Sequence, residues 1–362
     1  MNKSRLHIVG LGLIGGSMAM GLREADYGIT GWDRDPERLK EAREREIIDG
    51  VIEPGDELEG TDGIILAVPV PSMVSVTGKY VSGTSDLQFV TDVGSTKDWI
   101  VGEMEKVLPE SVEFVGGHPM AGSEQSGLKV ADPLLFENAI CVITATNGNT
   151  GSVQSVRSMW KDLGALIMEL SPGEHDQLAA RISHLPHLVA SGLLHSISTE
   201  DIPADKALAL AAGGFRDTTR IAEGDPELWR DIFETNQERI IEVVDQFRRV
   251  LDGIRDSIAG EDWEKVTEWL DQARNIRRDI PEKAKGMVGT LYELRLQAPD
   301  KPGTLARITG LLKEAEINIC DIEVLRVREG EMGTVKVAFR REEELEEARH
   351  VLRNSDSDID VM

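Results

Sequence analysis

Cysteine and long apolar runs are scarce in this chain of 362 residues. Its two cysteines, Cys141 and Cys320, stand far apart, so they supply neither a disulfide framework nor a Cys-rich metal site. No apolar stretch approaches the roughly 20 residues that cross a bilayer, and residues 1–5 run directly into a strand-like segment without a signal-peptide core. We therefore expect a reduced protein of the cytoplasm with no membrane partner.

Basic residues are also in the minority. The chain has 40 Lys and Arg against 65 Asp and Glu, which gives a formal charge of -25 and a pI near 4.7. Such a surface repels nucleic acid and anionic membranes. We expect the partners to be small molecules and further copies of the chain. The acidity leaves open a requirement for high salt.

The first 170 residues alternate short apolar strands with helical patterns, which is typical of a doubly wound parallel sheet. We interpret residues 1–170 as an α/β Rossmann domain that binds a dinucleotide. The predicted strands are 6–9, 28–32, 63–68, 89–93, 113–115 and 139–143.

Two further patterns follow along the chain. Residues 171–286 show long amphipathic helices, for example 229–254 and 263–279, and predict an all-α domain. Residues 290–362 alternate again and predict a small α+β domain of ferredoxin-like βαββαβ order. Its predicted elements are strand 291–297, helix 304–314, strands 319–327 and 333–339, helix 342–352 and a short last strand, 359–362.

The first predicted strand ends in the run Gly10-Leu11-Gly12-Leu13-Ile14-Gly15. This spacing allows a tight turn, approach of the backbone to a pyrophosphate, and close packing of helix on strand, with the phosphate at the helix N-terminus. We therefore assign this run to the cofactor through Gly10, Gly12, Leu13, Ile14 and Gly15.

Residues after the second and third predicted strands complete the expected cofactor site. A carboxylate at Asp33 would accept hydrogen bonds from the ribose hydroxyls and repel a 2'-phosphate, which favours NAD. Arg34, the next residue, is of the type that accommodates this phosphate, so NADP stays an alternative cofactor. Because ligands of open α/β sheets lie outside the carboxyl ends of the strands, we add Val68 and Pro69 to the site.

Polar residues also follow the fourth and fifth predicted strands. Ser95, in the segment 92–97, is expected to face the nicotinamide and substrate, while Ser95 or Thr96 also has the residue type of a helix N-cap. His118 stands in a glycine-punctuated segment, 116–124, which predicts a loop. Oxidation of an alcohol needs a base for the hydroxyl proton, and neutral imidazole suits that role near pH 7. We predict that His118 is this base, although a lone loop histidine is more often structural.

Five segments together resemble the prephenate dehydrogenase family. They occur in the family's order, and the resemblance covers about residues 5–285. It implies a Rossmann domain, a helical dimerisation domain, a homodimer, and an active site in the cleft between the two domains. The segments are 10–15, 92–97, 117–122, 183–187 and 213–220.

The resemblance also implies residue roles. His118 corresponds to the histidine that hydrogen-bonds the substrate ring hydroxyl, and Ser95 to a serine that assists it. Arg220 corresponds to the arginine that binds a substrate carboxylate, a role that suits the two-pronged guanidinium. The other implied substrate-binding positions are His187, Gly213 and a charged pair of Glu124 with Arg216, where some relatives have lysine.

The implied reaction is the NAD-dependent oxidative decarboxylation of prephenate to 4-hydroxyphenylpyruvate and CO2 in tyrosine biosynthesis. His118 takes the hydroxyl proton while hydride leaves the same ring carbon. Loss of CO2 from the opposite carbon then makes the ring aromatic, so the enzyme mainly positions its reactants. We predict no metal, because His184 and His187 lack the carboxylate of an HExxH-type arrangement.

The C-terminal region resembles an ACT domain, a module that binds amino acids. Its signature turn is 298–305, and Gly303 before a helix lets backbone N–H groups approach a ligand carboxylate. We expect tyrosine to bind here as an inhibitor, while a domain that only dimerises stays an alternative. The expected ligand residues are Asp300, Pro302, Gly303 and Asn318.

Three other functions can be weighed against the sequence, and the first of them stays open. An arogenate dehydrogenase would run the same reaction on the transaminated substrate. A catalytically silent amino-acid sensor would not need Ser95, His118 and Arg220 together. A β-hydroxyacid dehydrogenase would need a lysine base in the helical domain, and none stands between Arg181 and Asp205.

Overall fold

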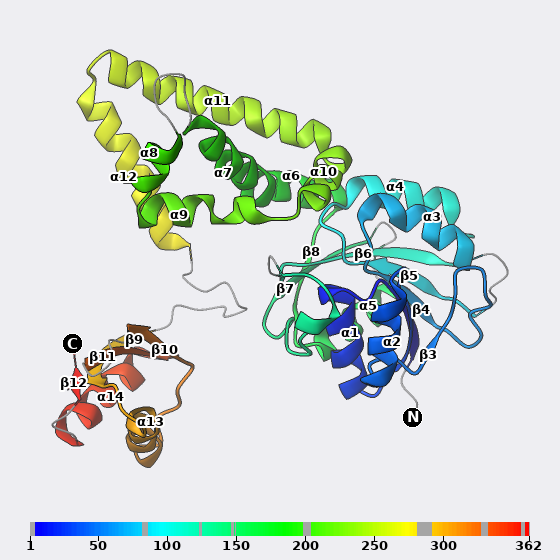
Figure 1. Ribbon diagram of the computed structural model, residues 1–362, viewed down its shortest axis with the longest axis horizontal. Coiled ribbons are helices and arrows are strands. Elements are labelled where there is room, and N and C mark those ends of the chain that lie inside the picture. The colour runs from blue at the N-terminus through cyan, green and yellow to red at the C-terminus, as the bar shows by residue number, and fades with distance from the viewer. Residues whose placement is uncertain are drawn as a thin grey trace. The chain divides into compact units, whose positions relative to one another are not determined.

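The computed structural model describes residues 4–81, 86–122, 125–145, 148, 150–197, 204–280, 292–326, 332–355 and 359–361. Their contacts divide the chain into two units, one that ends at Ile280 and one that contains the residues from 292 onward (Figure 1). In the part of the chain that is described, no helix is both long and apolar enough to cross a bilayer.

An eight-stranded sheet forms the centre of the first unit. Its strand order is β3-β2-β1-β4-β5-β6-β7-β8, and all neighbours are parallel except the antiparallel pair β6–β7. The six predicted strands are present, whereas β3, with only two residues, and the half-exposed β8 were not predicted. The strands are β1 Arg5–Val9, β2 Gly28–Trp32, β3 Gly50–Val51, β4 Gly63–Leu66, β5 Phe89–Asp92, β6 Glu113–Pro119, β7 Ile140–Thr144 and β8 Leu166–Glu169.

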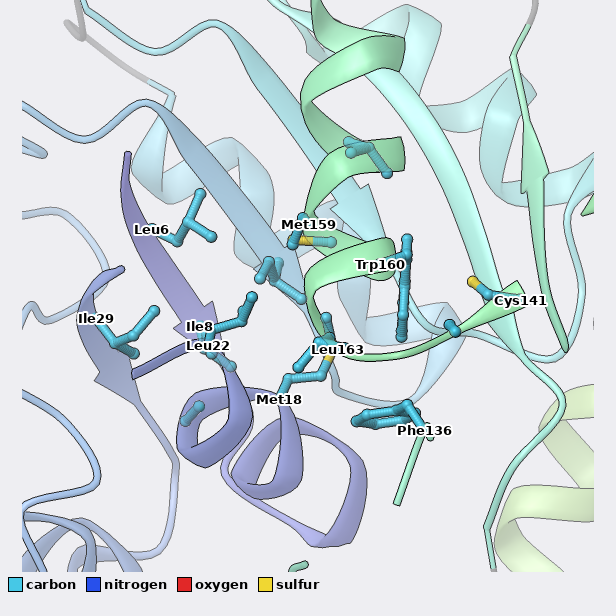
Figure 2. Packing of buried hydrophobic residues seen from close by; sticks show 14 of the residues in the cluster. Leu6, Ile8, Met18, Leu22, Ile29, Phe136, Cys141, Met159, Trp160 and Leu163 are labelled. Carbon is cyan, nitrogen blue, oxygen red and sulfur yellow. The ribbon is translucent and has the colours of Figure 1, made fainter. Parts of the chain in front are cut away.

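Helices cover both faces of this sheet, as the doubly wound prediction requires. Alternate residues of β1 point to opposite faces, so Ile8 packs in one apolar core and Val9 in the other. The helices are α1 Leu13–Glu24, α2 Pro36–Glu44, α3 Val70–Tyr80, α4 Asp98–Val107 and α5 Gly151–Asp162, with a short 3-10 turn η1 at Leu128–Val130. Figure 2 shows the first core, where Met18 of α1 lies near Leu163 and Leu22 lies near Ile8 of β1.

The prediction of a loop around His118 is wrong. Strand β6 continues through Gly116 and Gly117 to Pro119, and His118 pairs with Val142 of β7. The two glycines allow this because a Cβ on Gly117 would lie 2.6 Å from the backbone oxygen of Asp92. The glycines here therefore indicate close packing of the strand, not a loop. The antiparallel pair β6–β7 also differs from the predicted sheet, in which all strands are parallel.

The helical region after the sheet confirms the predicted all-α character. The single helix predicted over 229–254 is wrong, because Asn236 (φ -129°, ψ 30°) separates two helices and donates from Nδ2 to the Asp176 carbonyl oxygen. The elements are α6 Pro172–Ala179, π-turn η2 Ala180–His184, α7 Leu185–Ser196, α8 Ala204–Ala209, α9 Gly213–Thr219, 3-10 turn η3 Arg220–Glu223, α10 Pro226–Thr235, α11 Gln237–Ala259 and α12 Trp263–Asp279.

The second unit is a small α+β domain with its own apolar core. Its sheet has the order β10-β11-β9-β12 with antiparallel neighbours, and the predicted short last strand is present as β12. The elements are β9 Tyr292–Pro299, α13 Thr304–Glu314, β10 Asp321–Arg326, β11 Met332–Phe339, α14 Glu342–Ser355 and β12 Asp360–Val361. The predicted βαββαβ order is confirmed.

Candidate active site

The loop between β1 and α1 has the geometry of a pyrophosphate site. Gly10 has φ +96°, and a Cβ on Gly15 would overlap the Gly10 carbonyl oxygen, so both positions require glycine. A Cβ on Gly12 would meet open space, which is where a ligand has room to approach the backbone. The first N–H groups of α1, at Leu13 and Ile14, have no partner within the helix and suit an anion.

Asp33 is a buried carboxylate at the end of β2. It accepts hydrogen bonds from the Leu11 N–H at 2.7 Å, the Asp35 N–H at 2.9 Å and Arg38 Nη1 at 3.0 Å. The arginine paired with Asp33 is therefore Arg38, which was not predicted from the sequence, whereas Arg34 is exposed. The carboxylate is fixed beside the glycine turn, where the adenosine ribose of a dinucleotide would lie.

The carboxyl end of β4 borders the same turn. A Cβ on Gly10 would lie 2.9 Å from the Val68 side chain, so Val68 closes one wall of the site. Pro69, which is exposed, directly precedes α3. The arrangement of the β1, β2 and β4 ends fits a bound dinucleotide.

His118 has a hydrogen-bond partner from the helical region. Its Nδ1 lies 2.7 Å from Nε2 of His175 on α6, and Nδ1 of His175 lies 2.7 Å from Oδ1 of Asp176. Both partners are buried. His175 and Asp176 were not predicted from the sequence, although a His-Asp pair at a helix start with the capping residues Ser171 and Glu174 was a usable signal.

The surroundings keep His118 neutral. Burial lowers the pKa of His118 well below its usual value, and repulsion between a protonated His118 and the charged forms of His175, Lys97 and His184 acts in the same direction. At neutral pH the ring therefore has an unprotonated nitrogen, which is the state a proton acceptor needs.

A buried ion pair supports the strand end that carries His118. The Lys97 ammonium bonds to the Asp92 carboxylate, and both side chains are fully buried. Asp92 also accepts the Gly117 N–H at 3.0 Å and the Gly94 N–H at 2.8 Å. The charged pair thus joins the end of β5 to the residue that precedes His118.

Ser95 lies partly exposed between β5 and α4, beside the strand that carries His118. The alternative that Ser95 or Thr96 caps α4 is wrong, because the N-cap residue is Lys97 and the carboxylate of Asp176 accepts the first N–H groups. The Thr96 hydroxyl instead lies 2.8 Å from the Thr235 hydroxyl of α10. A substrate role for Ser95 stays a prediction.

A second cluster surrounds His187 on α7. Its ring stacks on Trp229, with centroids 3.6 Å apart and planes 13° apart. Burial lowers the pKa of His187, while a hydrogen bond with the Ile221 backbone raises it. Arg220, the residue before Ile221, is exposed on η3.

The other expected substrate residues are less constrained. Gly213 and Arg216 are exposed on α9, while Glu124 lies outside the described residues. In the second unit, Gly303 has φ +94° and precedes α13, as the expected amino-acid turn requires. Asp300, Pro302 and Asn318 are exposed in the same unit. The roles of all these residues stay predictions.

Among the described residues, no three or more His, Cys, Asp or Glu side chains lie close enough together to hold a metal ion. The glycine turn, the acid after β2 and a neutral histidine on β6 are together typical of a dinucleotide-dependent dehydrogenase. Fold and site thus define a Rossmann dehydrogenase with a helical region and a separate α+β unit.

Comparisons with known proteins identify the family. The model of the prephenate dehydrogenase nucleotide-binding domain matches residues 18–169, that of its dimerization domain matches 171–272, and that of the ACT domain matches 292–353. A prephenate dehydrogenase of Bacillus subtilis is 34% identical over 97% of this chain and 96% of its own length. The chain belongs to the prephenate dehydrogenase family, which confirms the resemblance seen in the sequence.

Solved structures agree with the fold of the first unit. A prephenate dehydrogenase of Aquifex aeolicus, in complex with hydroxyphenyl propionate and NAD+, has a TM-score of 0.70 and 32% identity, and the match covers 77% of this chain and 99% of that one. An arogenate dehydrogenase of Synechocystis has a TM-score of 0.68 and 31% identity over 76% of this chain and 99% of that one.

Proposed function

We propose that this chain catalyses the NAD-dependent oxidative decarboxylation of prephenate to 4-hydroxyphenylpyruvate and CO2 in tyrosine biosynthesis. The observation that carries the proposal is His118, a neutral imidazole on β6 whose Nδ1 is engaged by His175. Such a ring has its other nitrogen available for the hydroxyl of a substrate.

The cofactor would be held by the β1, β2 and β4 ends. Backbone N–H groups at Leu13 and Ile14 suit the pyrophosphate, and the Asp33 carboxylate suits the ribose hydroxyls. The Arg38 guanidinium, which is already bound to Asp33, adds one positive charge beside that carboxylate. A positive charge there can accommodate the 2'-phosphate of NADP, so the experiment below includes NADP. When bound, the nicotinamide would supply the hydride acceptor.

Within this proposal, His118 Nε2 takes the proton of the ring hydroxyl as hydride leaves the same carbon. Decarboxylation at the opposite ring carbon returns an electron pair to the ring and makes it aromatic. The product is a phenol, so the proton on His118 goes back to the product oxygen and the step releases no net proton. Ser95, beside β6, would assist at the hydroxyl.

Prephenate is a dianion, and the helical region supplies the residues for its carboxylates. Arg220 would bind one carboxylate, with His187 nearby on α7. Gly213, Arg216 and Glu124 would line the remaining pocket. In support, the His187 ring is held against Trp229 and by the Ile221 backbone, next to Arg220 in sequence.

The proposal assigns residues 1–170 to cofactor binding, 171–286 to dimerisation and substrate binding, and 290–362 to feedback inhibition by tyrosine. The match to a dimerization domain supports a homodimer. Exposed apolar side chains on α11 and α12 offer it a surface; examples are Ile241, Leu251, Trp263, Trp269 and Ile276. Tyrosine would bind at the turn before α13, through Asp300, Pro302, Gly303 and Asn318.

Arogenate is the second candidate substrate, because a solved arogenate dehydrogenase matches the first unit almost as well as the prephenate enzyme does. The test follows cofactor reduction by absorbance with prephenate or arogenate, and with NAD or NADP, each with and without tyrosine. Turnover of prephenate with NAD, suppressed by tyrosine, is expected. Turnover of arogenate alone would change the substrate, and no turnover with any pair would contradict the enzyme assignment.

A further inference from the structure

The hydrogen-bond chain behind His118 has a defined direction. A carboxylate only accepts hydrogen bonds, so Nδ1 of His175, which lies 2.7 Å from Asp176 Oδ1, carries a proton. In a neutral ring the other nitrogen, Nε2, is then an acceptor. It lies 2.7 Å from Nδ1 of His118, which must therefore be the donor. His118 Nε2 is left unprotonated.

We propose that His175 and Asp176 are positioning residues that fix His118 in the tautomer whose Nε2 accepts the substrate proton. The inference rests on the proposed function, because it concerns the base of that reaction. It adds two residues to the catalytic apparatus that act through His118 and need no contact with the substrate.

Asp176 is well suited to anchor this chain as an anion. Its carboxylate accepts the Lys97 N–H at 2.7 Å and the Asp98 N–H at 2.9 Å, at the N-terminus of α4. Backbone N–H groups and the helix dipole stabilise negative charge at that place. The carboxylate is buried, so water does not compete for its hydrogen bonds.

The chain also joins two regions of the first unit. His118 stands on β6 of the sheet, whereas His175 and Asp176 begin the helical region on α6. Asp176 in turn binds the start of α4, which packs on the sheet. The base is therefore oriented only when α6 is docked against the sheet, so the helical region helps to set the protonation state of a Rossmann residue.

The arrangement is consistent with the proton balance of the reaction. When His118 Nε2 takes the hydroxyl proton, the ring becomes positive and its Nδ1–H bonds more strongly to His175. The Asp176 carboxylate at the far end of the chain stabilises that charge. The proton then returns to the phenol oxygen, and His118 recovers its starting tautomer.

The direct test is nitrogen NMR of the imidazole rings in the protein with NAD bound. The chain has seven histidines, and the signals of His118 are identified by their loss in His118→Asn. We expect a protonated Nδ1 and an unprotonated Nε2 at pH 7.5. A protonated Nε2 would overturn the proposal, and this readout does not depend on turnover.

Two substitutions of His175 test the consequence for catalysis. His175→Phe keeps a ring but removes the acceptor, and we expect kcat to fall about a hundredfold while the KM for prephenate and the Kd for NAD change less than about twofold. His175→Gln places an amide oxygen near the same position, so its kcat should be at least about tenfold higher than that of His175→Phe. His195→Gln, the same change at an exposed histidine of α7, is the matched control and should equal the parent protein.

The outcomes separate the proposal from simpler explanations. If His175 only packed between the two regions, His175→Gln would be no better than His175→Phe, and that result would refute a hydrogen-bonding role. Wild-type kcat in a folded His175→Phe would refute it as well. If His175→Phe does not fold, the tautomer measured in the unmutated protein decides. Absence of turnover in the unmutated protein would refute the proposed function and leave the tautomer result standing.

Discussion

Two histidines of the eight-stranded sheet have lowered pKa values but different partners. On β1, burial lowers the pKa of His7 to about 3, and its Nδ1 lies 3.0 Å from the Thr30 hydroxyl. Its ring packs against Tyr80, and within the described residues its Nε2 is buried without a hydrogen-bond partner. On β6, His118 is also neutral, but its Nδ1 is bonded to His175 and through it to Asp176.

The difference shows that a low pKa alone does not identify a base. Burial accounts for neutrality in both rings. What distinguishes His118 is a partner chain that ends in a carboxylate and a place near the carboxyl edge of the sheet, where ligands of this fold bind. His7 has a hydroxyl partner and lies in the middle of β1, enclosed by the core.

The largest expected effect comes from removing each ring in turn. His118→Asn should lower kcat for prephenate by about a hundredfold or more, because the proton acceptor is lost, while NAD binding stays intact. His7→Asn should leave kcat within about threefold of the parent protein. Initial rates at pH 8 and 25 °C, with NAD binding measured by calorimetry, make the comparison.

Near-wild-type turnover of His118→Asn would show that His118 is not the base, and it would contradict the contrast between His118 and His7. Equal losses in both variants, with both proteins folded by circular dichroism, would mean that the sheet as a whole limits catalysis. Either result would redirect attention to Ser95, a partly exposed polar residue beside β6.

The cofactor turn and most strands could be predicted from the sequence, whereas the hydrogen-bond chain behind His118 could not. The glycine turn and Asp33 come from one short stretch, β1-α1-β2, so spacing alone was sufficient to predict them. The six predicted strands are apolar runs with clear turns between them. Strand β3 is too short for a period, and β8 is too exposed to read as buried.

The chain behind His118 could not be predicted in the same way. His118 and His175 are 57 positions apart and meet only because α6 docks on the sheet. Asn236 breaks a helix whose apolar period continues, because its side chain bonds across to Asp176. Arg38 replaces Arg34 as the partner of Asp33 since the former lies one helical turn further along. Tertiary contacts decide each of these features.

The second effect concerns stability at acid pH. For His7 the pKa of the folded state, about 3, lies below the usual 6.5, so the unfolded state binds the proton first. Stability is therefore full above about pH 6.5 and falls as pH drops toward 3. At pH 5 this one group should cost about 2 kcal/mol. His184, whose pKa burial lowers to about 4, acts with the same sign.

His7→Asn isolates the contribution of that ring. The loss of unfolding free energy between pH 8 and pH 5, from urea titrations followed by far-UV circular dichroism, should be smaller in the variant by about 2 kcal/mol. An unchanged pH dependence would mean that His7 takes up a proton equally readily in the folded and unfolded states, and the parallel with His118 would fail.

The smallest effect comes from removing the partner of His7. Thr30→Val deletes the hydroxyl 3.0 Å from His7 Nδ1 with little change of shape, and should lower the unfolding free energy by about 1 kcal/mol without altering kcat. Thr77→Val is the matched control, because that hydroxyl is buried with no hydrogen-bond partner among the described residues, so its removal should not destabilise. A fall in kcat with Thr30→Val would contradict the contrast, since loss of a partner should impair turnover at His118 and only stability at His7.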